Sequence, residues 1–162
     1  MRVQVVAELA AEACGAPPAE NRAVQSFLAA MNSDDSFFQV SACEASLPPS
    51  TPWTDPHGFV GSFIVGFRPD ELNRNRGLFF SLLEKLAELL RDAGSADALE
   101  ARIGLTREAA DTGRLRLALQ LTANGNSLAQ AEMRWALGLV HVQQALLFTS
   151  RYFRQQFAAR ND

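Results

Sequence analysis

An alternating run of leucines near residue 118 places the strongest constraint on how this chain can fold. The leucines are Leu115, Leu117, Leu119 and Leu121. Because successive side chains of a strand point to opposite faces, this spacing predicts a strand with one buried face. The polar turn ANGN follows, and Ser127 with Gln130 forms a capping box that predicts the start of a helix.

The helix after Ser127 is expected to run to about Ala158, which is roughly 45 Å at 1.5 Å per residue. A chain of 162 residues fits one domain, with a radius of gyration of only about 15 Å. Leu137, Val140, Leu147 and Phe148 widen the apolar arc of this helix beyond one face, so we expect a second subunit to contact one side. With two leucines of an earlier helix, the residues expected at the dimer interface are Leu82, Leu86, Trp135, Leu139, Val142 and Leu146.

Hydrophobic periodicity predicts a single domain over 1–162 in three parts. Residues 1–31 are expected to form two helices, the second over Ala19–Met31, while 36–94 and 98–158 each form a strand, strand, helix unit. A proline-rich loop is expected at 47–58. Hairpins followed by helices favour a two-layer α+β fold, with an antiparallel sheet, helices packed on one face and a long C-terminal helix.

Composition narrows the classes of function. The chain has 15 Lys and Arg against 18 Asp and Glu, a balance that disfavours binding to nucleic acid. Cys14 and Cys43 do not suggest a disulfide framework, and two thiols cannot complete a zinc site. Glu8 interrupts the apolar stretch that a signal peptide would need. His141 interrupts the most apolar window of the chain, which is too short to span a membrane. We therefore expect a cytoplasmic protein with no membrane partner.

Candidate catalytic groups are sparse. Asp55 and His57 lie close together in TDPHG, an arrangement that can orient an imidazole for base catalysis. Asp-Pro and His-Gly are also ordinary turn pairs, and no nucleophile accompanies them. His141 lies among apolar neighbours, which is typical of a core or interface histidine. We therefore expect no catalytic residue, no metal and no cofactor.

Aromatic residues gather on the two early strands. The second of these, GFVGSFIVGF, is apolar on both faces, so one face can enter the core while the other needs a cover. The cover can be a partner chain, or it can be the first helices or the proline-rich loop of the same chain. The phenylalanines expected to contact a partner are Phe37, Phe59, Phe63 and Phe67.

The segments LFFSLLEKLAELL and GRLRLALQLTANGNSLAQAEMRWALGLVHVQQALLF, within residues 76–158, resemble the class I secretion chaperones of bacterial type III systems. The resemblance implies a nonenzymatic cytosolic homodimer that holds an extended segment of a secreted effector. It also implies apolar contacts at Val5 and Leu9. The extra helix and the long loop depart from the family pattern, and the YbjN-like fold is similar to the chain to about the same degree.

These patterns together favour a noncatalytic protein-binding protein, with a dimeric effector chaperone as the first hypothesis. A small acidic inhibitor or immunity protein that blocks a folded partner is the alternative, because it shares the size, the acidity and the lack of chemistry. A small-molecule enzyme with a site at Asp55 and His57 is the third class considered.

Overall fold

In a computed structural model of the chain, the structure describes residues 1–8, 22–46, 57–92, 99–108 and 111–158. Regular elements occupy almost all of these residues. They are β1 (Arg2–Glu8), α1 (Arg22–Met31), β2 (Phe38–Ser46), β3 (His57–Phe67), the 3-10 helix η1 (Asp70–Arg74), α2 (Arg76–Asp92), β4 (Leu99–Glu108), β5 (Asp111–Gly125) and α3 (Leu128–Ala158).

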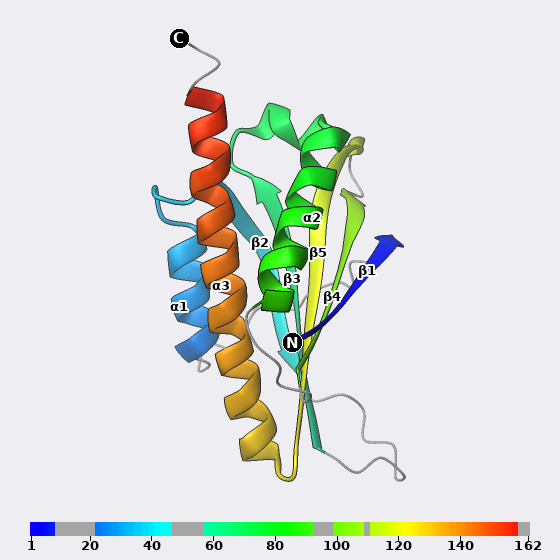
Figure 1. The fold of residues 1–162 in the computed structure, drawn as a ribbon, viewed down its shortest axis with the longest axis vertical. Coiled ribbons are helices and arrows are strands. Elements are labelled where there is room, and N and C mark those ends of the chain that lie inside the picture. The colour runs from blue at the N-terminus through cyan, green and yellow to red at the C-terminus, as the bar shows by residue number, and fades with distance from the viewer. Residues whose placement is uncertain (9–21, 47–56, 93–98, 109–110, 159–162) are drawn as a thin grey trace.

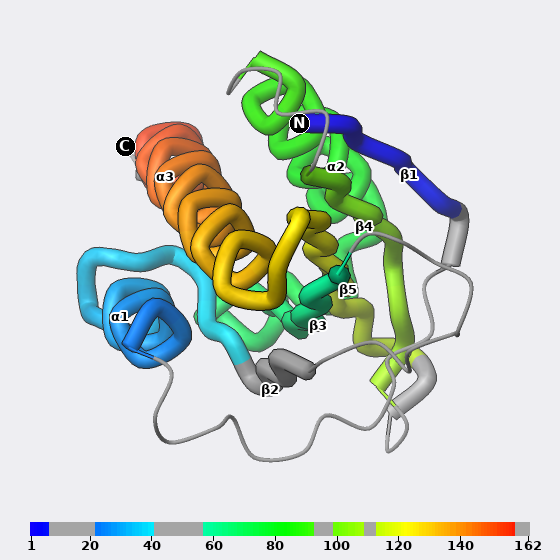
Figure 2. The backbone as a smooth tube through the Cα atoms, turned by 90° about the horizontal axis from the view of Figure 1, so that it is seen from below, coloured from blue at the N-terminus to red at the C-terminus, as the bar shows by residue number. Residues whose placement is uncertain are grey.

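The five strands form one sheet in the order β1-β4-β5-β3-β2. Helices α1, α3 and α2 lie side by side on one face of this sheet, with α3 in the middle (Figures 1 and 2). The predicted two-layer α+β architecture, with helices on one face and a long final helix, is confirmed. The middle position of α3 gives it an inward side on the sheet and an outward side that no other described helix covers.

The N-terminal segment differs from the prediction. Residues Arg2–Glu8 form the strand β1, which pairs in parallel with β4, so the sheet is mixed rather than wholly antiparallel. The spacing of Val3 and Val6 suits a helix as well as a strand. Valine is β-branched and packs well on a pleated surface, and the free edge of β4 provides the pairing that decides between them. The later residues of the predicted helix, including Leu9, lie outside the described residues.

The other elements follow the predicted patterns, except that the last two residues of the expected loop at 47–58 begin β3, while 47–56 lie outside the described residues. β2 and β3 form an antiparallel pair, and β4 and β5 form another, as the two strand, strand, helix units required. The Ser127 hydroxyl accepts a hydrogen bond from the backbone N–H of Gln130 at 3.2 Å, which confirms the first of the two hydrogen bonds of the predicted capping box. The side-chain oxygen of Gln130 accepts from the backbone N–H of Asn126 at 2.7 Å. In a standard capping box the donor would be the backbone N–H of Ser127, one residue later.

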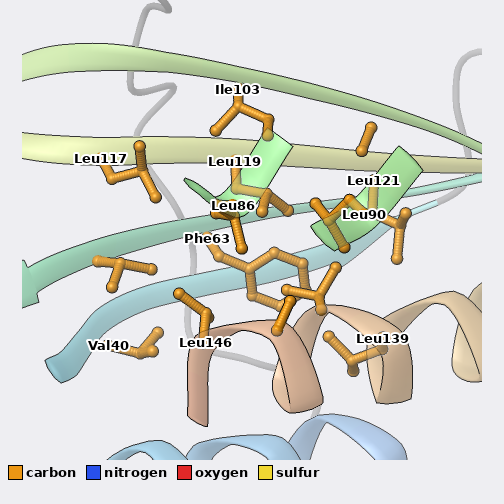
Figure 3. Packing of buried hydrophobic residues seen from close by; sticks show 14 of the residues in the cluster. Val40, Phe63, Leu86, Leu90, Ile103, Leu117, Leu119, Leu121, Leu139 and Leu146 are labelled. Atoms are coloured by element: carbon orange, nitrogen blue, oxygen red, sulfur yellow. The ribbon is translucent and has the colours of Figure 1, made fainter. Parts of the chain in front are cut away.

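The core lies between the sheet and the three helices. Leu117, Leu119 and Leu121 of β5 are buried and point toward the helix layer, as their alternation predicted (Figure 3). Leu139 and Leu146 of α3 approach them from the other side, around Phe63 of β3. Leu115 is only partly buried, at the end of the run.

The opposite face of the sheet has a different character. Its β5 residues include Arg114 and Arg116, and the Arg116 guanidinium donates to Glu108 at 3.0 Å. A Cβ atom on Gly66 would lie 3.0 Å from Cδ of Arg116, so glycine gives this arginine room to lie across β3. The described side chains of this face therefore do not form the aromatic patch that the early strands suggested.

Candidate functional site on the outward face of the last helix

The inward side of α3 is fully used by the core of the chain itself. Trp135 is buried, and its indole N–H donates to the Leu121 carbonyl at 3.0 Å. Its ring lies 5.1 Å from that of Phe59 and 6.0 Å from that of Phe63, measured between centroids. This side of the helix explains part of its apolar arc without a partner.

All of the residues expected at the dimer interface lie in this interior. Leu82, Leu86, Trp135, Leu139, Val142 and Leu146 are buried within a single chain. They are therefore not available to a second subunit in this structure. Periodicity shows that a helix has two apolar arcs, but it does not show which of them packs against the sheet of the same chain.

The outward side of α3 carries a line of exposed apolar side chains, which we call the α3 stripe. Its five members are 42–60% exposed and recur at intervals of three, four or eight residues. They are Met133, Leu137, Val140, Phe148 and Tyr152. Single exposed apolar residues are ordinary, but an aligned row of this length marks a surface for contact with another molecule.

A shallow pocket of about 240 Å³ lies between α2 and α3, directly beside the stripe. It is lined by Leu89, His141, Gln144, Ala145 and Phe148. Because Phe148 belongs to both, the pocket widens the apolar surface toward α2. Near it on α2, the Lys85 ammonium donates to Glu88 at 2.8 Å, and this hydrogen bond raises the pKa of Lys85.

Charge is excluded from the middle of this surface and concentrated at its ends. Residues 135 to 150 include no Asp, Glu, Lys or Arg, whereas Glu132 and Arg134 precede this stretch and Arg151 and Arg154 follow it. The Arg134 guanidinium donates to the Asn124 carbonyl at 2.7 Å, and that of Arg154 donates to the Asp34 carbonyl. An apolar centre with a polar rim is typical of protein interfaces.

The four phenylalanines expected to contact a partner are buried or partly buried in this structure. Phe63 and Phe67 are fully buried, Phe59 is nearly so, and all three lie under the helices rather than on a free face. Phe37 is partly buried and stacks on Phe153 and Phe157.

Val5 is the only one of the expected contact residues with a described side chain that is substantially exposed, at 47%. Leu9 lies outside the described residues. Leu137, Val140 and Phe148 had a signal in the sequence, because they widen the apolar arc of the last helix beyond its core seam.

Other kinds of site find little support among the described residues. No group of three or more His, Cys, Asp or Glu side chains comes close enough there to hold a metal ion. His57 is exposed at the start of β3, and Asp55 lies outside the described part. None of the helices that the structure describes is long and apolar enough to cross a membrane.

Comparison with known protein families found no match, and comparisons with curated proteins and with solved structures also found none. The resemblance to class I secretion chaperones therefore rests on sequence patterns alone.

Proposed function

We propose that the protein is a noncatalytic protein-binding protein, a cytoplasmic homodimeric chaperone that holds an extended segment of a secreted effector. The observation that carries the proposal is the α3 stripe, a row of exposed apolar side chains on a helix that is already anchored in its own core. A stable monomer gains nothing from such a row in water, whereas a partner chain that covers it removes apolar area from solvent.

The edge of the sheet supports an extended ligand. β1 lies at one end of the strand order and pairs on one side with β4. Val5 stands opposite Ile103 in this pairing, so it shares the face that the helices cover, yet it remains exposed at the rim. An extended segment can add to such an edge through backbone hydrogen bonds and place an apolar side chain against Val5.

The test begins with the tagged chain purified from its native cell. We expect a second protein in stoichiometric amount, and hydrogen exchange should show one long segment of it that is protected in the complex and exchanges freely when alone. Val5→Glu should reduce the retained partner at least tenfold, because it places a charge on the apolar rim. Gln4→Glu adds the same charge at the neighbouring exposed residue and should change retention less than twofold.

The other outcomes separate the classes of function. A partner that is folded and active alone, and that is blocked without losing structure, would support the inhibitor hypothesis in place of the chaperone. Purification without any stoichiometric protein would contradict the proposal as a whole.

Removing both candidate catalytic groups should have no effect on this function. The double variant Asp55→Ala with His57→Ala is expected to retain the partner within twofold of the unchanged chain, since neither residue belongs to the α3 stripe or to β1. Retention is measured by the same purification, with circular dichroism to verify the fold. If the variant stays folded but loses biological activity, the enzyme hypothesis gains support instead.

A further inference from the structure

The outward face of α3 has the spacing of a coiled-coil seam. Its positions 133, 137, 140, 144, 147 and 151 alternate between steps of four and three residues, which is a heptad pattern. The residues are Met133, Leu137, Val140, Gln144, Leu147 and Arg151, all of them exposed except Leu147, which is half-buried at the margin of the face. Four are apolar, and the polar ones stand at the middle and at the end. This pattern fits a helix as the partner, because heptad seams pack against other helices.

The seam is complementary to itself when its direction is reversed. In an antiparallel pair, the two kinds of heptad position face each other, so the numbers of opposing residues have a constant sum. With a sum of about 284, Leu137 faces Leu147 of the second copy, and Val140 faces Gln144. Met133 then faces Arg151, whose long stem can cover a methionine. Every seam position gains a partner, as an isologous two-fold interface requires.

The charges at the two ends of the seam distinguish between the two directions. A parallel pair would place Arg151 and Arg154 of one copy beside the same two arginines of the other. An antiparallel pair instead brings these arginines to the start of the opposing helix, where Glu132 lies exposed and the Arg134 guanidinium is turned to the Asn124 carbonyl of its own chain. Like charges in close contact oppose association and opposite charges favour it, so the antiparallel direction is preferred.

From this geometry we propose that the outward face of α3, through the seam from Met133 to Arg151, binds a second copy of the same chain. The two α3 helices lie antiparallel, and the two-fold axis crosses them at the height of residue 142, on the side away from the sheet. The inference rests on the proposed function insofar as the dimer is part of it. The seam from Met133 to Arg151 is about 27 Å long, and α2 widens the face through the pocket at Leu89 and Phe148. A standard interface buries ~800 Å² on each partner, more than a single row of side chains supplies, so the adjoining face of α2 is expected to take part in the contact.

Spin labels at the two ends of α3 test the direction directly. Ala129 and Gln155 are exposed and lie just outside the seam, so each can be changed to Cys in a chain with Cys14→Ser and Cys43→Ser. Pulsed electron paramagnetic resonance should give about 39 Å between two Ala129 labels, and the same between two Gln155 labels. A mixture of the two singly labelled chains should add a short distance below about 20 Å.

The alternatives give different distances. A parallel pair would give short distances in both single samples, and a dimer through another surface would lack the short distance in the mixture. A chain without any dipolar coupling at micromolar concentration is a monomer. Each of these three results would overturn the proposed contact.

A substitution in the seam tests the same contact independently. Leu137→Glu should raise the dissociation constant of the dimer at least 100-fold, measured by light scattering across a dilution series, while the monomer keeps its circular dichroism because Leu137 is 57% exposed. Phe80→Glu is the matched control, since Phe80 is 46% exposed on α2 outside the seam, and it should change the constant less than threefold. Equal effects of the two variants would contradict the contact.

These experiments use the purified chain alone, so their results can refute the α3 contact without affecting the chaperone proposal, and the reverse also holds. A monomer that still protects an extended segment of its partner would refute the α3 contact and leave the binding function in place. A dimer with the expected distances but without any stoichiometric partner would preserve the contact and refute the chaperone.

Discussion

Trp135→Ala is expected to lower the free energy of unfolding by about 4 kcal/mol, the range found when a large buried aromatic side chain is truncated. Trp135 is fully buried and fills the space between α3 and β3, where its ring contacts those of Phe59 and Phe63. The variant leaves a cavity there and also leaves the Leu121 carbonyl without its indole donor. Chemical denaturation followed by circular dichroism, at one fixed protein concentration, measures the loss.

Trp135→Phe is the matched variant for this prediction. It retains an aromatic ring against Phe59 and Phe63 but removes the indole N–H, so a smaller loss of about 2 kcal/mol is expected. If both variants unfold within about 0.5 kcal/mol of the unchanged chain, Trp135 does not occupy the core in the way the structure shows.

Asn73→Ala is expected to lower the free energy of unfolding by about 3 kcal/mol. Asn73 is a buried polar residue in η1, and its side-chain amide forms hydrogen bonds with both the backbone N–H and the backbone carbonyl of Phe67. Its oxygen accepts from the Phe67 N–H at 2.8 Å, and its nitrogen donates to the Phe67 carbonyl at 2.9 Å. The pairing of β3 with β5 ends two residues earlier, at Val65, so the Asn73 amide takes the place of a strand partner. The variant leaves a buried donor and a buried acceptor unpaired.

Asn75→Ala provides the comparison within the same turn. The Asn75 side chain accepts from the Leu78 amide at 3.2 Å at the start of α2, in an exposed position where water can replace it. Its loss should cost about 1 kcal/mol, as for an ordinary helix cap. A smaller effect for Asn73 than for Asn75 would show that the amide of Asn73 does not complete the end of β3.

The two ends of the chain show why sequence patterns succeed in one place and fail in another. β5 and α3 carry long periodic runs with a turn and a cap between them, so several independent signals agree. β1 is a run of only seven residues at an edge of the sheet, where Val3 and Val6 suit either period. Its conformation depends on pairing with β4, a partner almost a hundred residues away.

The candidate site was only partly predictable for a related reason. The wide apolar arc of the last helix was visible in the sequence, and it correctly indicated more apolar surface than one core face needs. The residues expected at the interface, such as Trp135 and Leu146, are nevertheless core residues, because periodicity alone does not show which of two apolar rows faces the sheet. In the sequence, the exposed residues Leu137 and Phe148 only widen that arc.

The sequence by itself determined the local elements of this protein: the buried face of β5, the start of α3 at its cap, the length of that helix and the α+β class. These features depend on side chains that are close along the chain, so periodicity and turn chemistry suffice to specify them. Only the tertiary structure decided that β1 is a parallel edge strand, and which arc of α3 is covered. A strand needs a neighbour for its hydrogen bonds, and a helix between two others buries the side that the sheet occupies. Both depend on contacts between residues far apart in the sequence.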